Sequence, residues 1–253
     1  MKPGHSCFID IPLREKKPRR TGLTILIDGG LSTQLFTDVI ESHSVFIDFV
    51  KFGWCTAIVT AKLRRKLEVL RHHNVRFFFG GTLFEKAVSQ KKIKEFYSYL
   101  NGCQCEYVEI ANGTIALSNS EKCEYIRHAA RSFRVFSEVG YKDHERSDKM
   151  YPQRWITYIK EDLEAGAEKV ITEARETGRS GICRSNGELR YGLIEEILNS
   201  GIDIQQLIFE APNKYLQAHF IKRLGANVNM ANISFHDIIG LETLRLGLHA
   251  DTF

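Results

Sequence analysis

Four glutamates stand near the ends of consecutive apolar segments of this chain. They are Glu109, Glu138, Glu173 and Glu210, and each comes close to the point where an apolar run gives way to Gly, Ala or Asn. One such side chain is often an ordinary surface carboxylate, but four at equivalent positions indicate a shared purpose. Carboxylates gathered in a partly enclosed site repel one another, so they require a cation among them. Because all-oxygen ligation suits a hard ion, the sequence predicts a magnesium site, with a metal-free ring of salt bridges as the alternative.

Three cations, Lys51, Lys142 and Arg175, occupy comparable places near the ends of apolar runs. In the segment SEVGYKD (137–143), an extended backbone would turn alternate residues to the same side, so that Glu138 faces Lys142. This pair is either an exposed ion pair at a strand end or a charged pair that serves chemistry. The segment alone leaves both interpretations open.

Eight segments have the character of strands that could bring these residues together. Each is a short apolar run that ends in Gly, Asn, Pro or a charged residue and precedes a helical pattern. They cover residues 23–30, 46–53, 75–81, 106–113, 133–140, 169–176, 207–212 and 227–233. This alternation predicts a single α/β domain, a (β/α)8 TIM barrel with parallel strands. In such barrels the active site forms where the strands end.

Two of the intervening helices can be placed in detail. An apolar stripe at Trp155, Ile156, Ile159 and Leu163 predicts a helix that ends at Gly166, a residue suited to the left-handed conformation. The last helix is predicted to begin with Ser234 as its N-cap residue. Its apolar residues are Ile238, Ile239, Leu241, Leu244 and Leu248. The N–H groups at its start would face a bound phosphate.

The composition excludes several classes of protein. The chain has 253 residues, of which 43% are hydrophobic and 26% charged. No apolar run approaches the roughly 18 residues that span a bilayer, and the N-terminus lacks a secretory pattern, so we expect a cytoplasmic location and no membrane contact. The six cysteines are scattered and are expected to be reduced thiols. The net charge of +4 owes much to REKKPRR (14–20), which fits a solvated tail or a barrel-floor segment and does not support nucleic-acid binding.

Several longer blocks resemble one family. FIDFVKFGW, EYVEIANGT, SEVGYKD, IFEAPNK and NVNMANI look like segments of the phosphosulfolactate synthase family, in a domain of residues 21–253 that follows an N-terminal extension, 1–20. The resemblance implies a TIM barrel and a magnesium-dependent lyase. This lyase adds sulfite to phosphoenolpyruvate through an enediolate-like intermediate, giving (2R)-phospho-3-sulfolactate. The reaction opens coenzyme M biosynthesis in methanogens and serves sulfolactate production in some spore-forming bacteria, the branch favoured by EKAVSQKK and APNKYLQ.

The resemblance and the chemistry of the side chains together predict roles for individual residues. Lys142 matches the lysine proposed as the family's acid-base residue, Lys51 is the lysine of FVKFG, and Glu138 would orient Lys142 and keep it charged. The predicted metal ligands are Glu109, Glu173 and Glu210. The predicted substrate-binding residues are Arg175, Asn232, Lys214 and Arg245, of which the last two are equally compatible with surface charges.

The chain departs from the family pattern at Gly29, Cys55 and His249, where the family has lysine, glycine and arginine. The loss of two cations predicts a weaker anion pocket. Two rival interpretations stay open: an aldolase-type enzyme with a Schiff-base lysine, and a non-catalytic stress-related barrel, since plant heat-stress-associated proteins also resemble the family. The expected partners are small anions, phosphoenolpyruvate and sulfite. Whether identical chains associate is left open.

Overall fold

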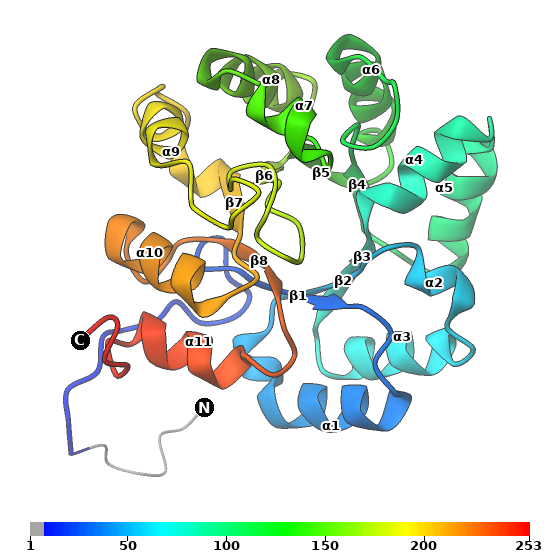
Figure 1. Cartoon of the computed structure of the whole chain (residues 1–253). Helices are drawn as coiled ribbons and strands as arrows, with labels where there is room; N and C mark the ends of the chain where they lie inside the picture. The colour runs from blue at the N-terminus through cyan, green and yellow to red at the C-terminus, as the bar shows by residue number, and fades with distance from the viewer. Residues whose placement is uncertain (1–7) are drawn as a thin grey trace.

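Eight parallel strands form a barrel with helices around it (Figure 1). The computed structural model describes residues 8–253. Every strand lies within one of the eight predicted segments, so the strand assignment and the (β/α)8 TIM barrel are confirmed. The strands are β1 (Thr24–Asp28), β2 (Phe49–Phe52), β3 (Arg76–Phe79), β4 (Tyr107–Ile110), β5 (Arg134–Val139), β6 (Lys169–Thr172), β7 (Leu207–Glu210) and β8 (Met230–Ile233).

Helices connect the strands and cover the outside of the barrel. They are α1 (Thr33–His43), α2 (Thr56–Val59), α3 (Leu63–His72), α4 (Gly81–Ser89), α5 (Ile93–Gly102), α6 (Asn119–Ala129), α7 (His144–Asp148), α8 (Pro152–Glu164), α9 (Tyr191–Leu198), α10 (Lys214–Leu224) and α11 (Ile238–Arg245). Short 3-10 turns, Ser44–Phe46 and Ile204–Gln206, precede β2 and β7. No helix within residues 8–253 is both long and apolar enough to cross a membrane.

The predicted stripe of α8 is confirmed. Trp155, Ile156 and Ile159 are buried against the barrel, while Leu163 is partly buried. Gly166 lies just beyond the helix with φ of 110°, in the left-handed region that a glycine adopts without strain.

The predicted start of the last helix is wrong. Its N-cap residue is Asp237, and α11 begins at Ile238. Ser234 instead forms a turn, in which its carbonyl accepts from the Asp237 N–H and its hydroxyl accepts from the His236 N–H. Local hydrogen bonding of this kind competes with helix capping, and it moves the helix N-terminus away from the strand end.

β8 joins the two halves of the sheet. Parallel ladders connect the strands in the order β3-β2-β1-β8-β7-β6-β5-β4, and none is found between β3 and β4 in the part of the chain that the structure describes. Side chains bridge this seam instead. Arg76 donates to the Tyr107 hydroxyl at 3.3 Å, and Glu109 Oε1 accepts from the Gly81 N–H at 2.6 Å. The barrel is therefore closed at one place by side chains and not by backbone pairing.

Alternation along the strands stacks an aromatic layer below a charged one. In three strands an aromatic residue is followed two positions later by an ionisable one on the same side: Phe49 and Lys51, Tyr107 and Glu109, Phe136 and Glu138. The Phe49 ring packs against the rings of Tyr107 and Phe136, with centroids 4.8 and 5.3 Å away. This apolar plug fills the barrel interior, so the charged groups can lie only at the end where the strands finish.

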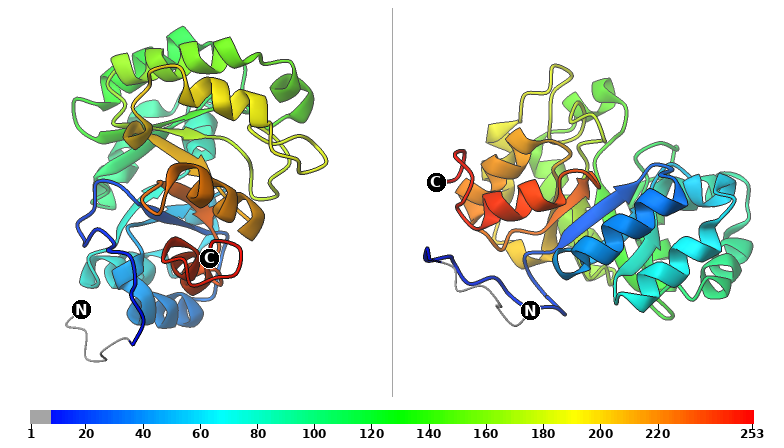
Figure 2. Two further views of the ribbon diagram at one scale, coloured as in Figure 1. Left: turned by 90° about the vertical axis from the view of Figure 1, so that its left-hand side faces the viewer. Right: turned by 90° about the horizontal axis from the view of Figure 1, so that it is seen from below.

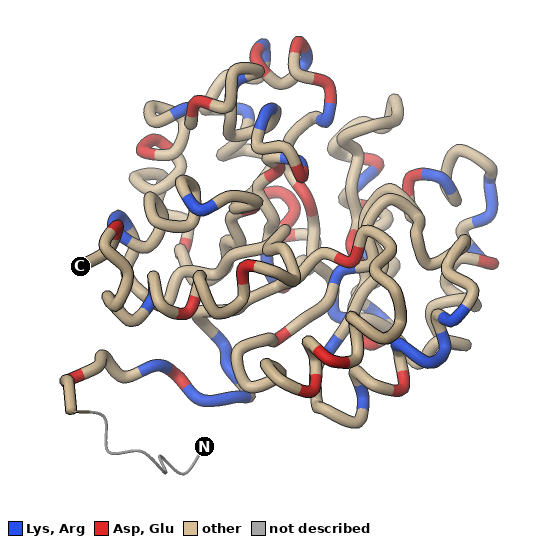
Figure 3. The backbone as a smooth tube through the Cα atoms, turned by 60° about the horizontal axis from the view of Figure 1, so that its bottom comes forward, with Lys and Arg blue, Asp and Glu red and all other residues tan. Residues whose placement is uncertain are grey.

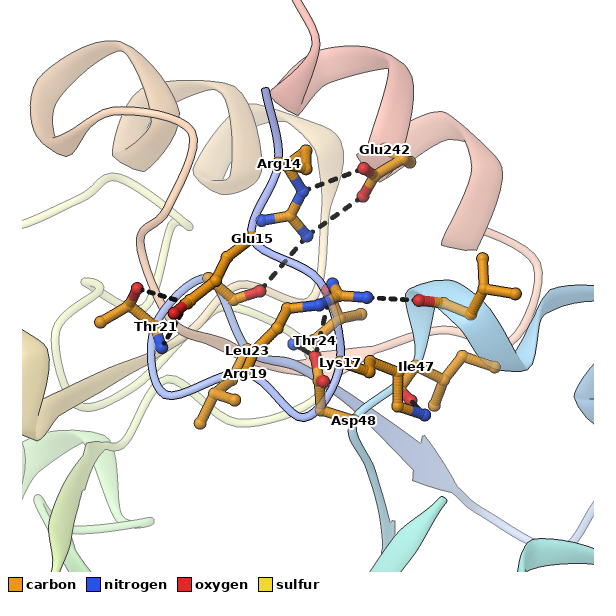
Figure 4. A network of polar contacts seen from close by, with 12 residues as sticks. Arg14, Glu15, Lys17, Arg19, Thr21, Leu23, Thr24, Ile47, Asp48 and Glu242 are labelled. Atoms are coloured by element: carbon orange, nitrogen blue, oxygen red, sulfur yellow. Dashed lines mark hydrogen bonds and ion pairs between the residues drawn. The ribbon is translucent and has the colours of Figure 1, made fainter. Parts of the chain in front are cut away.

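The basic run of residues 14–20 packs on the barrel floor, the end where the strands begin (Figures 2 and 3). Arg14 pairs with Glu242 of α11 at 2.9 Å, and Arg19 lies 3.6 Å from Asp48. Lys17 Nζ donates to the carbonyls of Ser44 and Ile47 (Figure 4). Of the two interpretations of this run, the barrel-floor segment is the observed one. Cys7 lies outside the described residues, and the other five cysteines are free thiols.

Candidate active site

A cavity of about 400 Å³ opens at the mouth of the barrel, where the strands end. Eight of the ten predicted site residues line it: Lys51, Glu109, Glu138, Lys142, Glu173, Arg175, Glu210 and Asn232. A larger cavity of about 850 Å³ lies on the floor near Lys17, Arg71 and Arg76. That floor cavity holds none of the four glutamates, so the smaller cavity is the candidate active site.

Lys51 lies at the centre of the carboxylates. Its Nζ is 3.0 Å from Glu109 Oε2, 3.3 Å from Glu138 Oε2 and 3.4 Å from Glu210 Oε1. Burial by itself would lower the pKa of this lysine, but the three carboxylates outweigh burial and raise the pKa of Lys51 well above its ordinary value. Lys51 is therefore a fixed positive charge at the base of the cavity.

Lys142 reaches into the same ring from the loop after β5. Its Nζ lies 2.7 Å from Glu138 Oε1 and 3.1 Å from Glu173 Oε2. Burial opposes its charge, yet Glu138 and then Glu173 raise the pKa of Lys142 well above the usual range. Its side chain is 24% exposed, against 8% for Lys51, so Lys142 is the lysine that a ligand can reach. The Glu138–Lys142 pair is thus part of the cavity and not an exposed surface pair.

Glu138 is the anion that both lysines share. Burial favours its neutral form, but Lys142 and then Lys51 overcome burial and lower the pKa of Glu138 below its ordinary value. Behind the strand, Lys122 of α6 donates to the Glu138 carbonyl at 3.1 Å and pairs with Asp162 of α8 at 2.7 Å. This fully buried pair fixes the backbone that carries Glu138.

The other glutamates accept backbone N–H groups of the surrounding loops. Glu210 Oε2 accepts from the N–H groups of Ala174 and Arg175 at 2.7 and 3.0 Å, and Glu173 Oε1 also accepts from Arg175 at 2.7 Å. Burial raises the pKa of Glu109 to about 7, and burial with the neighbouring Glu138 raises the pKa of Glu173 well above its ordinary value. Two of the four carboxyl groups therefore resist ionisation in this arrangement.

The cavity has the chemistry of a hard-cation site. Four carboxyl groups face two ammonium groups, so full ionisation of all four would leave negative charge in excess. Glu109 Oε2 and Glu173 Oε2 are buried and accept no well-directed hydrogen bond from the residues that the structure describes. Within residues 8–253, no group of three or more acidic, histidine or cysteine side chains is arranged to hold a metal ion by itself. The donor set therefore fits an ion such as magnesium, which takes one or two carboxylates and completes its shell with water or substrate oxygens.

Arg175 contributes its backbone to the glutamates. It adopts φ of 61°, an uncommon conformation for a residue with a side chain, and this lets one N–H reach both Glu173 and Glu210. The guanidinium lies at the cavity edge and approaches Glu176 at 3.6 Å. Its fork is available at the rim, where an anion would enter.

Two predicted substrate-binding residues lie outside the cavity. Lys214, at the start of α10, pairs with Asp251 at 3.0 Å and is largely exposed. Arg245 is buried on the floor and donates to the carbonyls of Ala226, Val228 and Leu23 at 2.5, 2.8 and 3.2 Å. The structure thus gives Arg245 a place at the opposite end of the barrel from the glutamates.

Sequence reasoning missed several residues that shape the mouth. Asp28 ends β1, but it turns outward and pairs with Lys66 of α3 at 2.5 Å, with both side chains fully buried. Glu85 of α4 accepts from the Thr114 N–H at 2.6 Å and adds to the negative field around Lys142. Trp54, which belongs to the segment FIDFVKFGW, lines the cavity although the sequence predicts no role for it. The sequence did contain a signal for such residues. Lys66 in α3, Glu85 in α4 and Lys122 in α6 are charged residues that recur with the spacing of the buried apolar residues of their helices.

Comparisons with known proteins agree with this architecture. A family model described as (2R)-phospho-3-sulfolactate synthase (ComA) matches residues 12–251. The chain is 55% identical to the phosphosulfolactate synthase of Bacillus subtilis over 97% of both chains. It is 37% identical to the phosphosulfolactate synthase of Methanothermobacter thermautotrophicus over 95% of both chains.

The fold is also found among solved structures. A phosphonopyruvate hydrolase determined in complex with oxalate and Mg²⁺ superposes with a TM-score of 0.55. The match covers 86% of this chain and 77% of the hydrolase at 14% sequence identity. At that identity the likeness concerns the barrel alone.

Proposed function

The chain belongs to the (2R)-phospho-3-sulfolactate synthase family, and we propose that it adds sulfite to phosphoenolpyruvate. The observation that carries this proposal is the gathering of Lys51, Lys142 and four glutamates in one cavity of a chain so similar to a named synthase. The enzyme is a carbon–sulfur lyase acting in the direction of bond formation. The higher identity to the Bacillus relative favours the sulfolactate branch over coenzyme M biosynthesis.

Both substrates are anions, so the charge of the cavity limits how they can bind. Lys51 is already surrounded by carboxylates, and full ionisation of the four carboxyl groups would give the ring an excess of negative charge. We therefore propose that Mg²⁺ is required, held by Glu109 and Glu173 with Glu210 as the third candidate ligand. When bound, the ion supplies positive charge for the substrate carboxylate as it takes on negative charge.

Lys142 is the proposed proton donor. Sulfur of sulfite forms a bond to C3 of phosphoenolpyruvate, and the C2–C3 π electrons move toward the carboxylate to give an enediolate-like intermediate. Lys142, kept protonated by Glu138 and Glu173, then delivers a proton to C2 on one face. Lys51 holds Glu138 from the other side, so that the donor is aimed into the cavity.

A Schiff-base mechanism is disfavoured by the same charges. A lysine nucleophile must be neutral, whereas neighbouring carboxylates raise the pKa of Lys51 and of Lys142. A non-catalytic barrel would have no use for buried carboxylates whose pKa values are raised, because such groups cost stability. Borohydride in the presence of a carbonyl compound should therefore leave both lysines unmodified.

The decisive experiment incubates purified protein with phosphoenolpyruvate, sulfite and MgCl₂. We expect sulfite consumption and formation of a phosphorylated sulfonate of R configuration at C2, detected by ³¹P NMR and mass spectrometry. EDTA should abolish the reaction, and Mg²⁺ or Mn²⁺ should restore it. Full turnover after rigorous chelation would remove the metal from the proposal, and absence of the sulfonate under all conditions would refute the activity.

A further inference from the structure

The active-site cavity has a charged half and a neutral half. Glu109, Glu138 and Glu210 belong to β4, β5 and β7, and Glu173 follows β6 directly. These four strands are neighbours in the barrel, and Lys142 follows β5. The wall formed by the ends of β8, β1 and β2 presents Asn232, Ile27, Gly53 and Trp54. Apart from Lys51, which leans across to the glutamates, this second wall is uncharged. A ligand in the cavity therefore meets two different environments.

Trp54 is the largest side chain of the neutral wall. It is 46% exposed and adopts φ of 49°, a conformation that is uncommon for a bulky residue and tends to persist at functional sites. The outer edge of its six-membered ring, with Cζ3 foremost, rests on Gly29, where a Cβ would overlap the ring. The indole N–H is on the opposite edge and so points away from Gly29. Gly29, which stands where the family has a lysine, thus leaves room for the ring of Trp54.

Asn232 is the polar group of this wall. It is 5% exposed, lines the cavity, and its Oδ1 accepts no hydrogen bond from the described residues. Its φ of 58° lies in the left-handed region, which asparagine and aspartate adopt more readily than most residues. A buried amide oxygen without a donor is costly, which indicates that a ligand completes the hydrogen bonds of this carboxamide.

The chemistry of the proposed reaction assigns a ligand to each half. In phosphoenolpyruvate the charges reside on the carboxylate and phosphate, which require Lys142, Arg175 and a cation. The methylene carbon C3 is the apolar part of the molecule, and the apolar groups that line the neutral wall, Ile27 and Trp54, are the surroundings that suit it. Because the new bond forms at C3, sulfite must approach from that side.

We propose that Trp54 and Asn232 form the sulfite subsite, an oxyanion site built from neutral donors. The Asn232 carboxamide both donates and accepts, which suits sulfite as well as its protonated form, and the indole N–H of Trp54 is a donor only. Neutral donors bind the second anion without competing for the carboxylates of the charged half. This subsite rests on the proposed function and adds to it a division of the cavity between the two substrates.

Steady-state kinetics with each substrate varied in turn tests the subsite. Asn232→Asp keeps the shape and tolerates the left-handed backbone, but it adds a negative charge. We expect the KM for sulfite to rise roughly tenfold or more, the usual scale for a lost hydrogen bond to a charged group, with the KM for phosphoenolpyruvate changed less than about twofold. Trp54→Phe, which keeps a ring but loses the N–H, should show the same selectivity at smaller size. Arg175→Met is the matched control from the other wall and should raise the KM for phosphoenolpyruvate instead.

Tryptophan fluorescence gives a reading that does not depend on turnover. The chain has two tryptophans, of which Trp155 is fully buried and Trp54 is 46% exposed. Sulfite alone should change the emission of the wild-type protein in a saturable way and leave Trp54→Phe unchanged. Product formation with unaltered sulfite KM values in both variants overturns the subsite and leaves the proposed function standing. A saturable response of Trp54 to sulfite, combined with no product in the complete assay with phosphoenolpyruvate and MgCl₂, supports the subsite and rejects the proposed reaction.

Discussion

The two ends of the barrel hold buried cations in opposite ways. At the mouth, Lys51 and Lys142 face carboxylates, which raise the pKa of each lysine above its ordinary value. On the floor, Lys17 and Arg245 face backbone carbonyls, and burial lowers the pKa of Lys17 to about 8 and that of Arg245 to about 9. The carbonyl groups accept the hydrogen bonds that Lys17 and Arg245 donate, but a carbonyl dipole does not neutralise the positive charge of either side chain.

This difference separates a structural use of charge from a chemical one. Lys17 and Arg245 bind backbone carbonyls, which cannot change protonation. The other floor cations, Arg14 and Arg19, pair with one carboxylate each. The mouth cations share ionisable partners, so a proton or a metal ion can redistribute the charge among them. Buried lysine or arginine alone does not mark a reactive site; the mouth differs because two lysines share several carboxylates that line one cavity.

The largest expected effect belongs to Lys142. Lys142→Met should fold normally and still bind phosphoenolpyruvate, but kcat should fall by roughly a hundredfold or more, the usual scale for a positioned acid. In heavy water the variant should also lose stereospecific deuterium incorporation at C2. Near-normal turnover by a folded variant would transfer the proton-donor role to Lys51.

The next effect is a pH dependence of stability at the mouth in metal-free protein. The pKa of Glu109 is about 7 in the folded chain against an ordinary 4.5, so the unfolded chain ionises first as pH rises. The folded state then loses stability between about pH 4.5 and 7, by up to about 3 kcal/mol. Glu109→Gln should remove that loss, which thermal melts across this range would record as a flatter profile.

Glu138→Gln is the matched control for that melt series. The pKa of Glu138 is lowered by its two lysines, so its contribution is present above about pH 4.5 and is lost only in more acidic solution. This variant should therefore melt earlier than wild type at neutral pH. Parallel profiles for wild type and Glu109→Gln would show that Glu109 ionises normally.

The smallest effect is expected on the floor. Arg14→Ala removes the paired contacts to Glu242 and the donation to the Gly22 carbonyl. Because the pair is partly buried but contacts no group of the mouth, we expect a loss of about 1–2 kcal/mol in unfolding free energy, with kcat and both KM values unchanged. A changed KM would mean that the two ends are coupled, which would break the distinction drawn above.

The sequence predicts the position of a site residue well where that position follows from the alternation of side chains along a strand and from where the strand ends. Glu109, Glu138 and Lys51 could be predicted as neighbours because parallel strands present their last inward residues at one rim. Arg245 could not be excluded, since a helix-terminal arginine looks the same in sequence whether it faces mouth or floor. Asp28 ends a strand as the glutamates do, but its register turns it outward to Lys66, a partner that no local pattern identifies. Asn232 is one of the predicted substrate-binding residues and lines the cavity, whereas the place of Trp54 depends on a backbone dihedral angle that composition does not encode.

The order of the strands also has a consequence for how the chain is made. β1 to β3 form one set of ladders and β4 to β7 another, and only β8 pairs with both. During synthesis from the N-terminus, both sets of strands are made before β8, so no backbone ladder can join them until residues 230–233 have left the ribosome. The ion pair between Arg14 and Glu242 likewise cannot form until Glu242 has been synthesised. A nascent chain stalled before β8 should therefore expose unpaired strand edges in both sets of strands. Chaperones should remain bound until β8 has been synthesised and has paired with β1 and β7.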